Sequence, residues 1–400
     1  MSNKITDSIF NVGVLNPNVR VADVVVQTRN GTTYNSYIVK GSEKTALIET
    51  VHRDYFDKYV ENVEKIIDID KIDYLVMNHN EPDHSGAIEK LAKLNPKMTV
   101  ITSPAGAIYL KNITNDSNLR LKVVKNDETI GLGDKTLRFI SAPFLHWPDS
   151  MFTWVEEEKT LFTCDFLGCH YCEPYGFDFE ITDKSAFFSS LRIYYNCIFS
   201  PFKKYVNSGI SKIKSLHISF VCPSHGPVLT KDCMLDQVLE KYNKWSSPQK
   251  RKNPLIPIFY CSAYGNTKRI AEAISKGIKS QIPTADVALY NVVECDLSDL
   301  SGELNKSDAF LVGSPTINKD AVSPIWNLLS TIDAINCAKK PVATFGSFGW
   351  SGEATSQIES RLKSLKLSTF DENFKICFTP TESDLKNATK FGERFAKSLK

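Results

Sequence analysis

Residues 77–86 carry the densest group of chemically active side chains in the sequence. Two histidines and two carboxylates, His79, Glu81, Asp83 and His84, fall within six residues. Imidazole nitrogens and carboxylate oxygens serve as metal ligands and also as proton donors and acceptors. The spacing therefore indicates either a metal site or a proton-transfer site.

The surrounding pattern places this group on a loop. Residues 72–77 are apolar and β-prone, which predicts a buried strand, and a helix is expected to open at Ser85 and run to about Leu94. On a strand-to-helix loop the side chains can converge on one point. A helix interior would instead spread them around the helix axis.

Three further candidate ligands follow downstream, each at or just after a predicted strand end: His146, Asp165 and His225. Together with the first four they make seven ligands. That is too many for one tetrahedral ion, but it suits two ions that share a bridging carboxylate.

A single histidine at a strand end is more commonly a hydrogen-bonded structural residue than a ligand. Here, however, four of the seven histidines lie on loops of one β-rich region, each beside Asp, Pro or Gly. We interpret His52 and His217, which lack such neighbours, as structural. His170 lies close to Asp165 in sequence and is a candidate for orienting a ligand or moving protons.

The ten cysteines are scattered over more than half of the chain. Only Cys169 and Cys172 have a C-x-x-C spacing, and one such pair without a second is weak evidence for zinc or redox chemistry. We expect the cysteines to be reduced and mostly buried packing residues.

A second group of polar residues begins after the predicted strand 256–260. A loop with hydroxyl groups and a glycine leads into a predicted helix over 267–282, where backbone N–H groups and hydroxyls suit a phosphate. The loop is neither a Walker A motif nor G-x-G-x-x-G, and alone it also fits an ordinary capped helix. Its candidate cofactor-binding residues are Ser262, Ala263, Tyr264, Gly265, Asn266 and Thr267.

Two later loops strengthen the cofactor interpretation. They follow the predicted strands 309–313 and 342–346, and in an open parallel sheet such loops meet at the carboxyl edge, where ligands bind. Trp350 offers an aromatic face for a planar ring. The candidates on these loops are Ser314, Pro315, Thr316, Ile317, Asn318, Ser347, Phe348, Gly349, Trp350 and Gly352.

Length and composition indicate two domains, or at most three, in an ordinary globular chain of 400 residues. A net charge of +2 calls for no nucleic-acid partner. No secretory signal or membrane-spanning stretch is apparent, so we expect a cytoplasmic protein. The polar, charged segment 246–253 predicts a boundary between domains at 1–249 and 254–400.

The two predicted domains differ in the order of their strands and helices. The first has alternating strands over 11–51, an amphipathic helix over 53–67, further strands to residue 163, and helices over 184–196 and 231–245. In the second, strands at 256–260, 286–290, 309–313, 342–346 and 375–378 alternate with helices, which predicts a parallel sheet covered on both faces.

The first group of ligands resembles that of the metallo-β-lactamase fold, an αββα sandwich. Zinc members of that fold usually carry His where this chain has Glu81, and a carboxylate there favours iron over zinc. This replacement, together with the run Trp-Pro-Asp-Ser-Met at 147–151, resembles the flavodiiron proteins. The resemblance implies one iron on His79, Glu81 and His146, the other on Asp83, His84 and His225, and Asp165 as the bridge.

The three later loops resemble flavodoxin, a doubly wound five-stranded parallel sheet that binds FMN. The two resemblances cover nearly the whole chain in the order of flavodiiron proteins (A-type flavoproteins). They imply reduction of O2 to water, of NO to N2O, or of both, with electrons from a separate rubredoxin-like protein or a reduced cofactor. They also imply a head-to-tail homodimer or a dimer of dimers, and a tyrosine, Tyr194 or Tyr195, in the pocket. We take Tyr195 as the candidate.

Two other functions fit parts of the sequence. A zinc hydrolase fused to a flavodoxin domain would use the first group of residues, although Glu81 argues against it. An FMN electron carrier would use only the second group and leaves the seven ligands unexplained.

Overall fold

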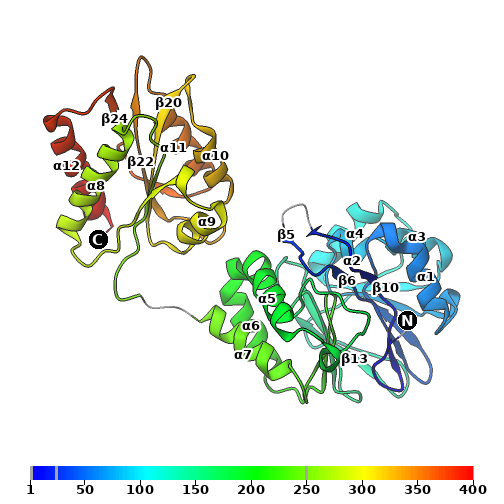
Figure 1. Ribbon diagram of the computed structural model, residues 1–400. Helices are drawn as coiled ribbons and strands as arrows, with labels where there is room; N and C mark the ends of the chain where they lie inside the picture. The colour runs from blue at the N-terminus through cyan, green and yellow to red at the C-terminus, as the bar shows by residue number, and fades with distance from the viewer. Residues whose placement is uncertain (1–2, 23–25, 248–250, 400) are drawn as a thin grey trace. The chain divides into compact units, whose positions relative to one another are not determined.

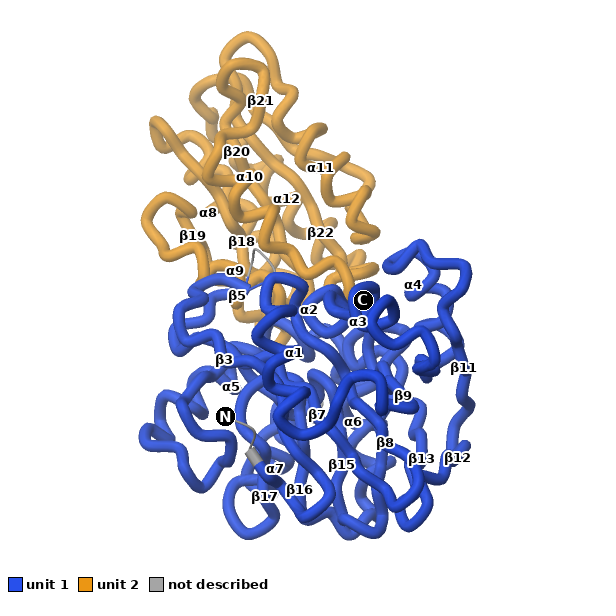
Figure 2. Tube along the Cα trace, turned by 90° about the vertical axis from the view of Figure 1, so that its right-hand side faces the viewer, with its two compact units in different colours: residues 1–248 blue, residues 249–400 orange. Residues whose placement is uncertain are grey.

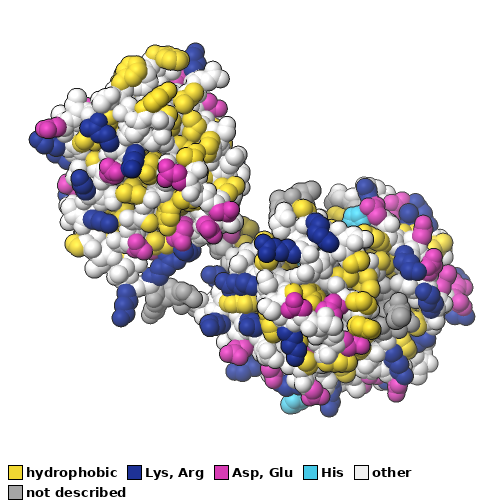
Figure 3. Space-filling view, in the orientation of Figure 1, with side chains coloured by type: hydrophobic (Ala, Val, Ile, Leu, Met, Phe, Trp, Pro, Cys, Tyr) yellow, Lys and Arg dark blue, Asp and Glu magenta, His cyan; other side chains and the backbone are white. Residues whose placement is uncertain are grey.

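The computed structural model describes residues 3–22, 26–247 and 251–399. The chain divides into two compact units, residues 1–248 and 249–400 (Figures 1 and 2). Lys and Arg side chains are interspersed with Asp and Glu over the visible face of each unit (Figure 3). No helix in the described part of the chain is both long and apolar enough to cross a membrane.

Unit 1 contains two large sheets. The first is antiparallel at one end and parallel from β8 onward, in the order β1 (Asn3–Lys4), β2 (Ile9–Asn11), β7 (Tyr37–Lys40), β8 (Thr45–Ile48), β9 (Tyr74–Met77), β10 (Thr99–Thr102) and β11 (Leu121–Val123). The second consists of β12 (Thr129–Gly131), β13 (Thr136–Ser141), β14 (Met151–Val155), β15 (Thr160–Cys164), β16 (Phe220–Pro223) and β17 (Leu229–Thr230). Two small ribbons pair β3 (Val14–Asn16) with β6 (Thr32–Tyr34) and β4 (Val21–Ala22) with β5 (Val26–Gln27).

The two sheets pack face to face with helices outside them. Val76 and Ile101 of the first sheet share a core with Phe139 and Val155 of the second. Because side chains alternate along a strand, the neighbouring Leu75 points to the other face of the first sheet. That face packs on α1 (Phe56–Glu64), α3 (Ile88–Leu94) and α4 (Pro104–Thr114), and the outer face of the second sheet packs on α5 (Lys184–Tyr194), α6 (Lys203–Ile213) and α7 (Leu235–Ser246). This is the predicted αββα arrangement.

Two of these helices were absent from the sequence prediction. Ser103 caps α4 by accepting from the Gly106 N–H at 3.1 Å, and Pro104 stands at its first position, both of which are start signals for a helix. The α6 helix follows a short 3-10 turn over Ser200–Phe202 with no side-chain cap. Its lack of a start signal explains why it is hard to find.

Unit 2 is a doubly wound sheet in the order β19 (Leu289–Asn291), β18 (Ile258–Tyr260), β20 (Phe310–Ile317), β22 (Pro341–Phe348) and then β23 (Ser368–Thr369) and β24 (Phe374–Cys377), which both pair with β22 in parallel. This is the flavodoxin order 2-1-3-4-5. One face carries α8 (Asn266–Gln281) and α12 (Glu382–Ser398), and the other carries α9 (Leu297–Lys306), α10 (Ser323–Ser330) and α11 (Ala354–Ser364) (Figure 1).

Two strands of this sheet run further than predicted. β20 continues to Ile317 and turns back at Asn318 and Lys319, both left-handed, into β21 (Asp320–Ala321). β22 likewise continues to Phe348. Residues interpreted as loops are therefore strand extensions that rise above the sheet edge.

Candidate metal centre and flavin site

The seven candidate ligands converge at one edge of the unit 1 sandwich. The loop after β9 supplies His79, and the short helix α2 (Pro82–Ser85), with Pro82 at its start and Glu81 just before it, supplies Asp83 and His84. The other three follow β13, β15 and β16. Strand ends of both sheets therefore deliver the side chains.

The first ligand set consists of His79, Glu81, His146 and Asp165, whose donor atoms lie within 4.8 Å of one another. Glu81 Oε2 is 3.2 Å from His79 Nε2 and 3.2 Å from His146 Nε2. Asp165 Oδ2 is 3.6 and 3.5 Å from the same two nitrogens. Two imidazoles and two carboxylates thus face one point.

The second set consists of Asp83, His84 and His225. Asp83 Oδ1 lies 3.3 Å from His84 Nε2, and Asp83 Oδ2 lies 3.0 Å from His225 Nε2. Asp165 again completes the group, because its Oδ1 is 3.2 Å from His84 Nε2 and 3.6 Å from His225 Nε2. Asp165 therefore turns one oxygen to each set, which is the geometry of a bridging carboxylate.

The electrostatics of the two sets fit cations. Burial alone would lower the pKa of His84, but the carboxylates of Asp83 and Asp165 raise it to about 10. The pKa of Asp165 is lowered despite its burial, because His84 and His146 face it. Asp83 Oδ1 is buried without a hydrogen-bond partner among the described residues. The carboxylates of Glu81, Asp83 and Asp165 thus favour positive charge on the facing histidine rings of the metal-free protein, and metal cations can supply that positive charge in place of the protons.

A buried carboxylate outside the two sets fixes the first histidine. Asp149 Oδ1 accepts from His79 Nδ1 at 3.0 Å, and its Oδ2 accepts from the Asn80 N–H at 2.8 Å. His225 is fixed in the same way, since its Nδ1 donates to the Thr33 carbonyl at 2.6 Å. Such outer partners set the ring orientation and leave Nε2 free to bind a metal.

Glu49 was not identified from the sequence. It follows β8, is 1% exposed, and its Oε1 accepts from the Asn78 N–H at 2.8 Å. Burial raises the pKa of Glu49 to about 8. A carboxylate at the end of the buried run 45–48 was the signal that could have identified it.

His170 lies against the second set, as its closeness to Asp165 in sequence suggested. Its ring centroid is 4.8 Å from that of His225, and its Nδ1 is 2.8 Å from Thr32 Oγ1. Burial and the nearby His225 lower the pKa of His170 to about 3, so the ring is neutral. Its Nε2 is buried without a partner in the described ranges, and His170 and Tyr194 both line a small cavity.

The tyrosine next to the ligands is Tyr194 and not Tyr195. The Tyr194 hydroxyl donates to Asp165 Oδ1 at 2.9 Å, whereas the Tyr195 hydroxyl lies 2.8 Å from Ser246 Oγ. Neighbouring residues on a helix point about 100° apart, so only one of the two can face the ligands. The structure therefore replaces the Tyr195 assignment with Tyr194.

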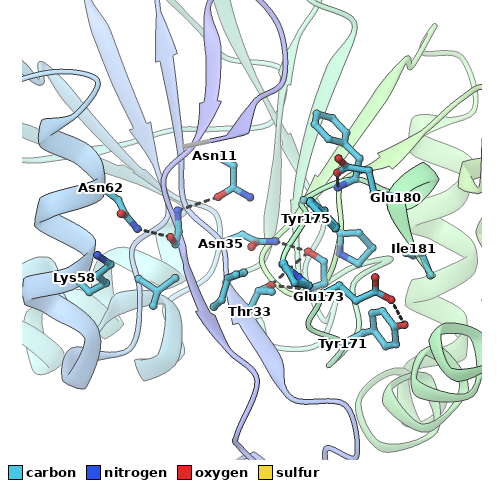
Figure 4. Close-up of a pocket in the computed structure, with 18 residues that line it drawn as sticks. Asn11, Thr33, Asn35, Lys58, Asn62, Tyr171, Glu173, Tyr175, Glu180 and Ile181 are labelled. Carbon is cyan, nitrogen blue, oxygen red and sulfur yellow. Dashed lines mark hydrogen bonds between the residues drawn. The ribbon is translucent and has the colours of Figure 1, made fainter. Parts of the chain in front are cut away.

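The cavity in Figure 4 is a separate feature. It has a volume of about 210 Å³ and lies between the N-terminal strands and the segment 171–181. Thr33 and Gly226 line it, but none of the seven candidate ligands does.

In unit 2 the first candidate loop has an open backbone cradle. Gly265 precedes α8 with φ +83°, a conformation that favours glycine, and no atom lies within 4 Å of the place a Cβ would occupy. Ser262 Oγ accepts from the Lys268 N–H at 3.2 Å, and Tyr264 is 92% exposed. The open helix start beside Ser262, Ala263, Asn266 and Thr267 fits a phosphate.

The other two candidate loops end beside this cradle. Ser347 Oγ lies 2.8 Å from Thr267 Oγ1, which ties the third loop to the first. Trp350, 83% exposed, and Gly349 follow β22, while Thr316 Oγ1 of β20 accepts from the Ala354 N–H at 3.3 Å. Ser314 is an exception, because its hydroxyl is fully buried and donates to the Pro315 carbonyl at 2.8 Å. Its side chain is therefore structural.

The architecture and sites define a class: a metallo-β-lactamase-like domain with a two-metal ligand set, joined to a flavodoxin-like domain. Residues 32–226 match the family model described as ODP family beta lactamase, and residues 258–392 match that of flavodoxin. Among similar proteins, the flavo-diiron protein FprA2 of Clostridium acetobutylicum is 52% identical over 397 residues, which cover 99% of both chains.

Two further comparisons agree. A nitric oxide reductase of Moorella thermoacetica is 32% identical over 98% of this chain and 97% of its own. The solved rubredoxin oxygen:oxidoreductase of Desulfovibrio gigas covers 100% of this chain and 98% of its own, with a TM-score of 0.74 and 28% identity. The chain belongs to the flavo-diiron proteins and is an oxidoreductase.

Proposed function

We propose that each chain binds two iron ions and one FMN, and that it reduces O2 to water, NO to N2O, or both. The observation that carries the proposal is the placement of Asp165, with Oδ2 toward one histidine pair and Oδ1 toward the other. The relatives named as a nitric oxide reductase and a rubredoxin oxygen:oxidoreductase support this choice of substrates.

The ligand assignment follows the two sets. His79, Glu81 and His146 would hold one iron, and Asp83, His84 and His225 the other, with Asp165 between them. Carboxylate-rich sets with imidazole favour iron over zinc, because hard oxygen donors stabilise its oxidised state. When bound, the iron pair supplies electrons and Lewis acidity to a diatomic substrate, and FMN supplies further electrons.

The surrounding side chains position these ligands and handle protons. Asp149 and the Thr33 carbonyl hold the rings of His79 and His225. Tyr194 donates its hydroxyl hydrogen to Asp165 Oδ1, which reduces negative charge at that oxygen. The neutral His170 lines the small cavity beside Tyr194 and has a buried Nε2 without a partner among the described residues, so a water bound there would pass protons inward through this ring.

In unit 2 the first loop would bind the FMN phosphate at the start of α8 through its backbone N–H groups and hydroxyls. Trp350 and Tyr264 would cover the flavin ring, since both are exposed aromatic side chains beside the cradle. Thr316, Ile317, Asn318, Phe348, Gly349 and Gly352 would line it from the other two loops.

Electron supply and assembly complete the proposal. The electrons would come from a separate rubredoxin-like protein or a reduced cofactor. We also propose that two chains associate head to tail, so that the flavin of one chain serves the metal centre of the other. A fully active monomer in analytical ultracentrifugation would contradict this assembly.

Metal analysis and an absorption spectrum of the purified protein test the central proposal. We expect about two irons and one FMN per chain, as the ligand sets and the cradle require. Stopped-flow oxidation of the reduced protein by O2 and by NO then identifies the preferred substrate. Two zinc ions with flavin-independent hydrolysis would overturn the assignment in favour of a hydrolase.

A further inference from the structure

A third group of metal-ligating atoms lies next to the second ligand set. A carboxylate oxygen of Glu49, a ring nitrogen of His84 and Cys164 Sγ are all within 4.8 Å of one another. All three side chains are buried, each 1% exposed. The group lies outside the pattern of seven ligands, apart from the shared His84.

The two carboxylate oxygens of Glu49 differ in their hydrogen bonding. Oε1 accepts from the Asn78 N–H at 2.8 Å, whereas Oε2 has no hydrogen-bond partner among the described residues. Leaving a buried carboxyl oxygen without a hydrogen-bond partner is costly in either protonation state, so a purely structural role accounts for Oε1 but not for Oε2. The backbones of Glu49 (φ +60°) and Cys164 (φ +51°) are also left-handed, which is uncommon for residues other than glycine.

We propose that Glu49, His84 and Cys164 form a binding set for a thiophilic divalent cation of the Zn²⁺ class. A thiolate is a soft donor and selects zinc over iron, in contrast to the oxygen-rich sets beside it. On binding, the Cys164 S–H proton is released to solvent and an S–metal bond forms, with no change in oxidation state. Three protein donors would leave the fourth position of a tetrahedral zinc ion to water.

The shared histidine makes this set a competitor of the iron centre. His84 Nε2 lies 3.3 Å from Asp83 Oδ1 and 3.2 Å from Asp165 Oδ1. A cation bound by Glu49 and Cys164 would either take this nitrogen or bind to the other nitrogen of the same ring, where the two cations would repel each other. Zinc would therefore displace the iron of the second set and inhibit the enzyme. This regulatory step rests on the proposed iron centre, but zinc binding by the three residues does not.

The binding step is tested on the metal-free full-length protein with Co²⁺, which substitutes for Zn²⁺ and gives a near-ultraviolet charge-transfer band when a thiolate binds it. We expect a band equivalent to one cobalt–thiolate bond, abolished by excess Zn²⁺ and absent from Cys164→Ser. The matched control is Cys222→Ser, since Cys222 is equally buried at 1% exposure but belongs to no ligand group among the described residues.

Glu49→Gln gives a second reading if the serine variant fails to fold. It preserves the side-chain volume and an oxygen for the Asn78 N–H, and it should weaken Co²⁺ binding at the thiolate at least about 10-fold. Circular dichroism reports whether each variant folds. No thiolate band in the parent protein, or a band that survives Cys164→Ser, would overturn the proposal.

Competition is measured on the iron-loaded protein by dialysis against Zn²⁺ and metal analysis. The parent should exchange about one of its two irons for zinc, as expected if one ligand set is dismantled, whereas Cys164→Ser should keep the iron it had before dialysis. Loss of both irons from parent and variant alike would contradict competition at this set. A parent without iron but with the cobalt–thiolate band would reject the proposed function and leave the third set standing.

Discussion

The candidate metal centre and the candidate flavin site differ in how far their side chains are exposed to solvent. The seven candidate metal ligands are buried or nearly so, with Glu81 at 19% the most exposed side chain, and outer partners hold the rings of His79 and His225. The candidate flavin site instead presents Tyr264 and Trp350 at 92% and 83% exposure. A metal centre needs ligands held in fixed positions. A cofactor that binds at the surface can itself cover the exposed aromatic side chains of its site.

The largest test of this contrast is Asp165→Asn, which keeps the side-chain shape but removes the shared charge. We expect both metal positions to bind at least about 100-fold more weakly, because one carboxylate serves both sets, while FMN binding is unchanged. Metal analysis after a chelator challenge measures this. The exposed Asp232→Asn is the control, and full retention of either metal would refute the bridging role.

A smaller and selective effect is expected from Asp149→Asn. The amide weakens the support of His79 Nδ1, so iron at the first position should bind about 10- to 100-fold more weakly than in the parent, with the second position less affected. Mössbauer spectra of partly loaded protein distinguish the two positions. Equal weakening at both would argue that Asp149 only stabilises the fold.

Gly265→Ala should affect the flavin site alone. An alanine at this position would have to keep φ +83° beside the phosphate cradle, which costs about 1–2 kcal/mol for a residue with a Cβ. FMN affinity should therefore fall about 10-fold, with the iron content unchanged. Fluorescence titration of the FMN-free protein measures it. Gly302→Ala on α9 is the matched control: its Cβ meets open space at an ordinary φ, and it should be neutral or stabilising.

The stabilities of the two units should also differ in their dependence on pH. In the metal-free protein the folded-state pKa of His84 is about 10, above its ordinary 6.5, so its contribution is complete below pH 6.5 and is lost as the pH rises through 10. Calorimetry should show the unit 1 transition falling over this window. In the metal-loaded protein cations replace these protons, and a fall of the same size there would contradict the assignment.

The smallest effect is expected from Trp350→Ala. With 83% of its surface exposed, the side chain contributes little to folding, and the melting temperature should move by less than about 1 °C. FMN affinity should fall only a few-fold, through lost stacking of about 0.5–1.5 kcal/mol. A large loss of stability would mean that the aromatic side chain is packed in the fold and is not a wall for the cofactor.

The sequence allowed the paired architecture and the convergence of seven candidate ligands to be predicted, because both depend on local patterns. His79, His146 and His225 follow predicted strand ends, which indicates that they lie together on loops. The alternation of strands with helices predicts the parallel sheet of unit 2. Glu49 also stands at a strand end and could have been found in this way, although its contact with the Asn78 N–H could not. The Thr33 carbonyl could not be found, since its role arises only when strands distant in sequence are brought together. Ser314 looked like a binding hydroxyl, but the extension of β20 turns it inward.

The backbone changes its helical geometry directly after Tyr194. The helix α5 ends at Tyr194, and a π-helical turn follows over Tyr195–Phe199. In an ordinary helix, residues five apart point in clearly different directions. Here the wider turn keeps Tyr194 on Asp165 while Phe199 lies against His146 at 6.2 Å between ring centroids.

This turn places a constraint on the length of the chain as well as on its composition. Removing a single residue from 195–199 would tighten the turn to an ordinary helix and rotate everything beyond it by about 100°. The side chains of the turn could therefore vary, whereas the number of residues in it could not. Insertions and deletions, more than substitutions, should be the changes that this part of the protein does not tolerate.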